Sequence, residues 1–236
     1  TMIEESLRYL RSSEDWIKTV LIGGLLTIFG FLLVPLFIVV GYYVRVLRGT
    51  MHDESEPPVF DDWGEMLMEG LKGFAIYVVY GLVPGIIGAI IAFVGIGGAI
   101  AGDSGAAGVL GGLVALVGFL VALALGLLAA YIVPAALANF VEKDDLMAGF
   151  AFGEIRAVIT TKAYAMGWLT AFALLLGAGI LTSVLSIVPV IGTVIGIFVT
   201  FYAAVAAFYV IGHTWADVHP VDLHEEEEMP GQQPAI

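Results

Sequence analysis

The side chains best suited to hold a metal ion lie near the C-terminal end of the sequence. In GHTWADVHP, residues 212–220, His213 and Asp217 are four residues apart and His219 follows them. Residues four apart share one face of a helix, so these side chains could bind a metal ion between them. The same residues also suit the end of a membrane helix that Trp215 anchors at the membrane surface. We favour this second interpretation and expect no metal ion and no cofactor.

Two other stretches resemble catalytic or metal sites. GDSG, residues 102–105, matches the surroundings of a serine nucleophile, but no histidine near it in the sequence could act as its base. Asp61, Asp62 and Glu65 would need a geometry that the sequence does not supply in order to bind a metal ion. The chain has no cysteine, which excludes thiolate chemistry. We therefore expect no catalytic residue and no enzymatic activity.

The composition is that of a protein embedded in a membrane. Hydrophobic residues make up 60% of the chain and charged residues 13%, whereas soluble proteins have about 45–50% and about 25%. Acidic residues outnumber Lys and Arg by 22 to nine, which argues against nucleic acid as a partner. Such acidity is typical of proteins that face strong brine, and it predicts a halophilic archaeal source.

Four apolar segments are each long enough to cross a bilayer, which takes about 20 helical residues. They are residues 73–101, 106–140, 163–187 and 191–213. Turn-forming and charged residues separate them. The sequence therefore predicts an all-α, polytopic helical membrane protein whose single membrane-embedded domain covers residues 1–219. A charge run and PGQQPAI predict a disordered acidic tail over residues 220–236.

Residues 17–47 form a fifth apolar stretch, with Pro35 near its middle. The stretch could be one tilted, kinked span or a re-entrant hairpin that folds back at LVPLF, residues 33–37. Basic residues prefer the cytoplasmic side of a membrane. A re-entrant hairpin places all nine on that side, whereas a single span would place the first three outside. The nine are Arg8, Arg11, Lys18, Arg45, Arg48, Lys72, Lys143, Arg156 and Lys162. We expect the hairpin, with the basic loops and both termini cytoplasmic.

Polar, helix-compatible stretches at about residues 4–15, 62–72 and 145–161 precede the membrane segments and predict interfacial helices. In the second, Trp63, Met66 and Leu67 begin one apolar helix face, and Asp62 suits the position before the first turn. Aromatic and long basic side chains can lie at the headgroup level. The residues predicted to anchor the protein at the lipid interface are Trp16, Arg45, Arg48, Trp63, Lys72, Arg156, Lys162 and Trp215. For the two arginines, ion pairs with nearby acids are an alternative.

Three segments together are similar to a known family. They are GYYVRVLRG, FDDWGEMLMEGLKGF and YIVPAALANFVEKDDLMAGFAFGEIRAV. With an acidic linker between the first two, they resemble the archaeal and bacterial membrane proteins catalogued as domain of unknown function 4013. The resemblance extends from about Trp16 to Gly212. It implies a polytopic membrane fold and no established activity, so it transfers no functional residue.

The distribution of charge argues against ion-coupled transport. Between Lys72 and Glu142 the one charged residue is Asp103, and between Lys162 and Asp217 there is none. Coupled transporters keep carboxylates inside the membrane for that purpose. Glycines four residues apart, in contrast, allow close contact between helices, either within one chain or between copies. These pairs are Gly81 and Gly85, Gly108 and Gly112, and Gly192 and Gly196.

Two functions agree with these observations. The first is a non-catalytic scaffold or accessory subunit in the cell membrane, which packs with copies of itself, with lipids or with a larger membrane complex. The alternative is a pore or uncoupled permease for a small solute, because broken helices in a membrane usually line a cavity. Hydroxyl side chains that could line such a path are Thr182, Ser183, Ser186, Thr193 and Thr200.

The predicted topology can be tested by cysteine labelling, since the chain has no cysteine of its own. Asp103→Cys and Lys143→Cys should react with a membrane-impermeant maleimide from opposite sides of the membrane. Labelling of both positions from one side would contradict the topology.

Overall fold

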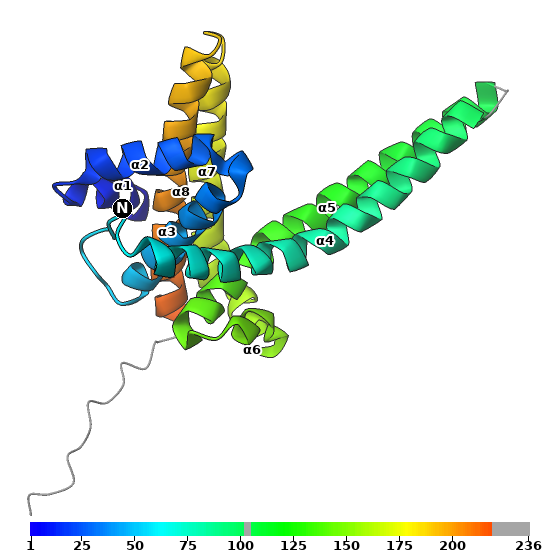
Figure 1. Ribbon diagram of the computed structural model, residues 1–236. Coiled ribbons are helices and arrows are strands. Elements are labelled where there is room, and N and C mark those ends of the chain that lie inside the picture. The colour runs from blue at the N-terminus through cyan, green and yellow to red at the C-terminus, as the bar shows by residue number, and fades with distance from the viewer. Residues whose placement is uncertain (102–104, 219–236) are drawn as a thin grey trace, which may run out of the picture.

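The computed structural model describes residues 1–101 and 105–218, and these residues form an all-α protein, which confirms the predicted fold class (Figure 1). The α-helices are α1 (Met2–Tyr9), α2 (Trp16–Ile28), α3 (Val34–Met51), α4 (Trp63–Ala101), α5 (Gly105–Lys143), α6 (Phe152–Ile159), α7 (Lys162–Leu185) and α8 (Ile191–Val218). Three 3₁₀ helices accompany them, η1 (Leu10–Ser12), η2 (Gly30–Leu32) and η3 (Leu146–Phe150). The predicted tail, residues 220–236, lies outside the described residues.

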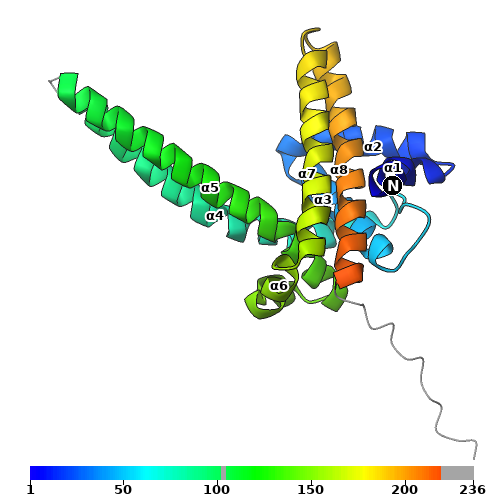
Figure 2. The same cartoon turned by 180° about the vertical axis from the view of Figure 1, so that it is seen from behind.

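Two long helical hairpins diverge from a common body (Figures 1 and 2). Helices α4 and α5 form an arm, and α7 and α8 form a second hairpin that points away from it. In the described part of the chain, five helices are long and apolar enough to cross a membrane: α3, α4, α5, α7 and α8. The four predicted spans correspond to the last four of these, and α3 is added to them.

The segment 17–47 folds as two helices joined by a sharp turn. Helix α2 ends at Ile28, and Leu33 adopts a left-handed φ of 65° just before α3 begins. The break therefore lies slightly earlier than predicted, because Pro35 is in the first turn of α3, where its missing N–H costs nothing. Helix α2, with 13 residues, is about 20 Å long and too short to span, whereas the 18 residues of α3 reach about 27 Å. Residues 34–51 are thus a candidate span and not merely half of a re-entrant hairpin.

The predicted interfacial helices have different outcomes. Residues 63–72 and the predicted span 73–101 form one continuous helix, α4, which passes through Gly73 without a break. Figure 1 shows the start of α4 lying across the body before the rest continues into the arm. Residues 4–15 contain most of α1, which begins at Met2, and all of η1. Residues 145–161 divide into η3 and α6, which Ala151 separates with a non-helical backbone.

Helices α3 and α4 cross at backbone contact. A Cβ atom at Gly41 would lie 1.9 Å from the carbonyl oxygen of Met66, and one at Gly70 would lie 1.6 Å from that of Phe37. Neither distance is possible for a side-chain carbon, so only glycine permits this approach. The crossing places the acidic residues at the start of α4 beside the arginines at the end of α3.

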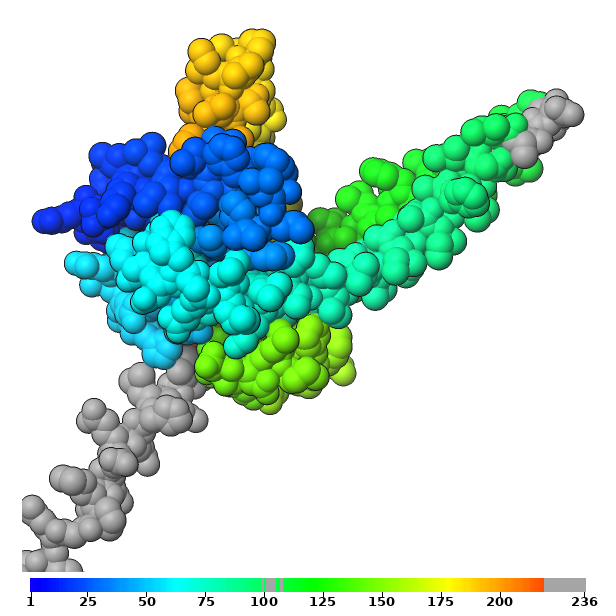
Figure 3. Space-filling model, viewed as in Figure 1, coloured from blue at the N-terminus to red at the C-terminus, as the bar shows by residue number. Residues whose placement is uncertain are grey.

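The buried core lies in the body, around the C-terminal half of α8. One cluster gathers Leu47, Phe140, Tyr164 and Trp215 from four helices. A second joins Tyr42, Met66 and Phe201, among others, beneath the N-terminal helices. Figure 3 shows these N-terminal helices, in blue, covering one side of the second hairpin.

We expect Gly70→Ala to destabilise the protein by about 1–3 kcal/mol or more, because the added carbon forces α3 and α4 apart. Thermal unfolding in detergent measures this loss. Gly81→Ala is the matched control, since nothing lies within 4 Å of the added carbon there. Equal unfolding temperatures for the two variants would contradict the backbone contact.

Candidate functional site

An ion-pair cluster joins the end of α3 to the start of α4. Arg45 donates from Nε to Glu69 Oε2 at 3.2 Å, from Nη1 to Asp61 Oδ1 at 2.7 Å and from Nη2 to Glu65 Oε2 at 3.2 Å. Arg48 donates to the other oxygen of Glu69. It also lies 3.7 Å from Asp144, which follows α5. The cluster thus ties together three helices and the linker before α4.

Burial makes Glu69 the central member of this cluster. Its side chain is 10% exposed, and that of Arg45 is 14% exposed, whereas Asp61 and Glu65 are more than half exposed. Exposed pairs contribute little to stability, but removing one partner of a buried pair leaves a charge unpaired in a medium that solvates it poorly. All three nitrogens of Arg45 bind carboxylates and Arg48 also pairs with Glu69, as the ion-pair alternative predicted. Contact of either arginine with lipid stays a prediction.

Pro134 leaves a backbone carbonyl of α5 without its usual helical hydrogen bond, and side chains of α7 supply the donor. Proline has no N–H, so the carbonyl of Ala130, four residues earlier in α5, has no partner within its own helix. The indole Nε1 of Trp168 donates to this oxygen at 2.9 Å. The hydroxyl of Tyr164 donates to the next carbonyl, that of Tyr131, at 2.8 Å. In a membrane such donors from a neighbouring helix are what makes an internal proline tolerable.

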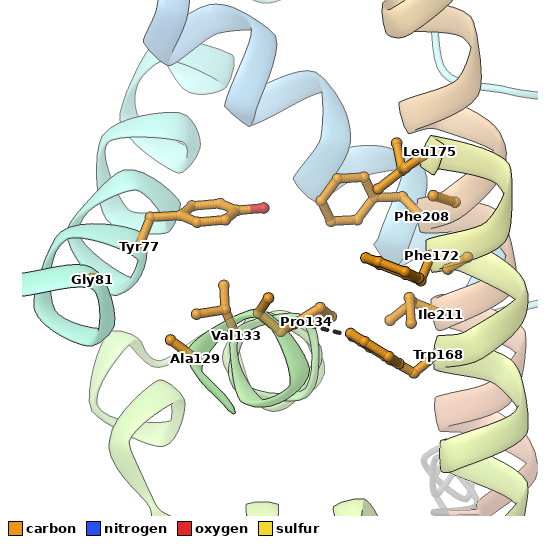
Figure 4. Close-up of a pocket in the computed structure, with 13 residues that line it drawn as sticks. Tyr77, Gly81, Ala129, Val133, Pro134, Trp168, Phe172, Leu175, Phe208 and Ile211 are labelled. Atoms are coloured by element: carbon orange, nitrogen blue, oxygen red, sulfur yellow. Dashed lines mark hydrogen bonds between the residues drawn. The ribbon is translucent and has the colours of Figure 1, made fainter. Parts of the chain in front are cut away.

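An apolar cleft of about 360 Å³ lies between the arm and the second hairpin, directly beside these bonds. Its walls come from α4, α5, α7 and α8, and they include Tyr77, Val133, Trp168, Phe172 and Phe208. Figure 4 shows the Tyr77 hydroxyl pointing across the cleft toward Phe208. The lining carries no charged side chain. The cleft therefore suits hydrocarbon and not a hydrated ion.

Four of the five hydroxyls proposed to line a pore bond to backbone oxygens instead. Thr182 and Thr200 both donate to the carbonyl of Gly196, Ser183 to that of Gly179, and Ser186 to that of Thr182. Thr193 is exposed near the start of α8. None of the five lines the cleft. Within the described residues these side chains do not form a polar path.

Trp215 is not an interfacial anchor. Its side chain is completely buried, and its indole Nε1 donates to Glu142 Oε2 at 2.9 Å. The sequence pattern was misleading because a tryptophan at a helix end looks the same whether it faces lipid or a neighbouring helix. This bond joins the end of α8 to the end of α5 and belongs to the core.

The remaining predicted anchors lie at the surface or partly exposed. The guanidinium carbon of Arg11 lies over the ring of Trp16, 5.7 Å from the centroid of that ring. Trp63 stacks on Phe60. Lys72 is partly exposed, whereas Arg156 and Lys162 are exposed. These positions are compatible with the headgroup level, and their contact with lipid stays a prediction.

The candidate metal ligands do not converge in the described residues. His213 bonds through Nδ1 to the carbonyl of Tyr209 at 3.1 Å, and its Nε2 lies 3.6 Å from Asp53. Asp217 is exposed, and His219 lies outside the described residues. From residues 1–101 and 105–218, no three histidine or carboxylate side chains gather as metal ligands would.

Of the three predicted glycine pairs, one lies at a helix–helix contact and two face open space. Gly192 and Gly196 pack α8 against α7, where added Cβ atoms would meet Leu185 and Thr182. Gly81, Gly85, Gly108 and Gly112 have nothing within 4 Å of an added carbon. The seam between α4 and α5 uses three other glycines, Gly88, Gly95 and Gly118. The seven-residue spacing of the first two is a helical signal that sequence reasoning could have used.

A comparison with protein-family models matches residues 27–191, more than half of the chain, to a family described as "Protein of unknown function (DUF4013)". No curated protein and no solved structure matches the chain. The matched range includes the ion-pair cluster, Pro134 and most of the cleft lining.

We expect Glu69→Ala to destabilise the protein by about 3–5 kcal/mol, because two guanidinium groups lose their buried partner. Glu65→Ala removes an exposed carboxylate from the same Arg45 and should cost about 0–1 kcal/mol. Chemical unfolding of both variants in detergent measures the difference. Similar losses would mean that Glu69 is not the central member.

Proposed function

Since this chain belongs to the DUF4013 family, whose description names no activity, we propose that it is a non-catalytic membrane scaffold or accessory subunit. It packs with copies of itself, with lipids or with a larger membrane complex. The proposal concerns the surfaces of the two hairpins, since these are what the protein offers to the membrane around it.

The observation that supports this role most directly is how little of the arm the chain itself covers. In the most apolar windows of α4 and α5, 6% of the residues are buried, against 44% for α8 and 56% for α3. The two helices contact each other along one glycine-lined seam and leave their other faces outward. Large outward side chains include Phe93 and Phe119.

The divergence of the hairpins supports the same role. A bundle that serves only its own stability would close its helices around one core. Here the two hairpins separate and leave the apolar cleft between them. Lipid chains or apolar parts of a partner can enter such a concave surface.

The geometry favours a scaffold over a pore or permease. A path for a small polar solute needs polar groups along its whole length. The cleft lining is apolar, and four of the five predicted pore hydroxyls bond to backbone oxygens. Arg45 and Arg48 of the body form ion pairs with Glu69 that hold helices together.

Photo-crosslinking in native membranes tests the scaffold. A benzophenone amino acid at Phe93, 81% exposed on the arm, should give one protein adduct of reproducible mass. The same amino acid at the fully buried Met66 is the control and should give no adduct between chains. Adduct formation with lipid only, together with a single 25.0 kDa species in native gels, would contradict protein assembly.

Flux measurements test the alternative. Proteoliposomes of the purified chain should release small neutral solutes no faster than protein-free vesicles do. Release well above that level, blocked by Phe172→Trp in the cleft, would establish a pore and overturn the scaffold.

A further inference from the structure

A second groove, of about 260 Å³, adjoins the cleft along α5, and Ala129 lines both. It is bounded by α4, α5 and the segment from η3 to α6, which Figure 3 shows in yellow-green beneath the start of the arm. Its lining is apolar and includes Val79, Val83, Leu128 and Ile132. We call it the lower groove.

Aromatic contacts hold the wall of the lower groove in place. Tyr80 stacks on Phe150 with ring centroids 5.9 Å apart, and Phe152 lies at the same distance from Tyr80. The Tyr80 hydroxyl donates to the carbonyl of Gly149 at 3.0 Å. Gly149 itself faces Ile76, so η3 rests directly on α4. The groove is therefore a built feature and not a gap between loose helices.

Two cations share the helix faces that line the lower groove. Lys72 precedes Val79 by seven residues and Val83 by eleven, which places all three on one face of α4. Arg156 follows Phe152 by four residues on α6, which is again one face. Along α4, Lys72 lies about 10 Å before Val79, toward the body.

Neither cation has an acidic partner among the described residues, although the chain holds 22 acidic side chains. Arg8, Arg45, Arg48 and Lys143 form ion pairs, whereas Arg11, Lys18 and Lys162, which do not line the groove, resemble Lys72 and Arg156 in having none within the described part of the chain. The acid nearest to Arg156 in sequence, Glu154, accepts from Lys143 at 2.5 Å and from Asn139 at 2.9 Å.

We propose that the lower groove binds an anionic phospholipid of the surrounding bilayer. One hydrocarbon chain lies against Val79, Val83 and Leu128, and the phosphate lies between Lys72 and Arg156. The complementary charge is local, because the chain as a whole has a formal net charge of −13 and repels anionic surfaces. A lipid that binds despite this repulsion must do so at a site where two cations are unopposed.

The charge beside the lower groove favours a lipid over an apolar partner helix. Two cations need an anion near the end of the groove, which an anionic phospholipid carries in its headgroup and an apolar helix does not.

Native mass spectrometry of the full chain in detergent tests the proposal. The protein is incubated with phosphatidylglycerol or with phosphatidylcholine of identical chains, and bound lipid is counted. We expect the unaltered chain to retain the anionic lipid preferentially. Lys72→Gln with Arg156→Gln should reduce that preference about tenfold or more, because two cations near the phosphate are lost.

The matched control is Arg11→Gln with Lys18→Gln, which removes the same charges from the N-terminal helices. It should leave the preference unchanged, as should the charge-conserving pair Lys72→Arg with Arg156→Lys. Val83→Trp should block chain entry, whereas Val94→Trp, outside the groove on the same helix, should not.

Equal retention of the two lipids by the unaltered chain would overturn the proposal, as would an undiminished preference in the first double variant. Unfolding temperatures of all variants are measured in parallel, and the charge-conserving pair separates lost binding from lost folding. Failure of this test leaves the scaffold proposal untouched, because a scaffold needs no particular headgroup.

Discussion

The backbone contact between α3 and α4 is the interaction on which the rest of the molecule depends. Helix α3 packs against α8, so whatever fixes α4 on α3 also fixes the arm relative to the second hairpin. Gly41 and Gly70 let the two backbones touch, and this closeness places Glu69 between Arg45 and Arg48. Close approach and charge pairing support each other, since a wider crossing would leave two partly buried cations without their carboxylate.

The long elements could be predicted from the sequence because hydrocarbon imposes a strong constraint on a chain. A segment of 20 or more apolar residues in a bilayer must be helical to satisfy its own backbone. The sequence lacked an equally strong signal at Gly73, where an interfacial helix and a span could have been separate or continuous. Glycine is compatible with both, and the contacts of Gly73 with Val40 and Val44 of α3 exist only once the helices meet.

The site was less predictable because its partners are distant in the sequence. Proline 134 predicts an unsatisfied carbonyl at Ala130, but nothing local indicates that Trp168 supplies the donor. Similarly, the spacing of Glu65 and Glu69 places both on one helix face, yet burial distinguishes them only in the fold. The anchoring role predicted for Trp215 was wrong for the same reason, since its partner Glu142 belongs to another helix.

The unequal lengths of the two hairpins have a consequence for the bilayer itself. Helices α4 and α5 each have 39 residues and are about 58 Å long, whereas the 24 residues of α7 reach about 36 Å. The hydrocarbon layer is about 30 Å thick, and excess apolar length is accommodated by tilt or by local thickening. One protein therefore presents two different hydrophobic mismatches to the same membrane. The splay of the arm allows the longer hairpin to tilt more than the shorter one, so the angle fixed at the α3–α4 contact determines which membrane thickness accommodates both hairpins.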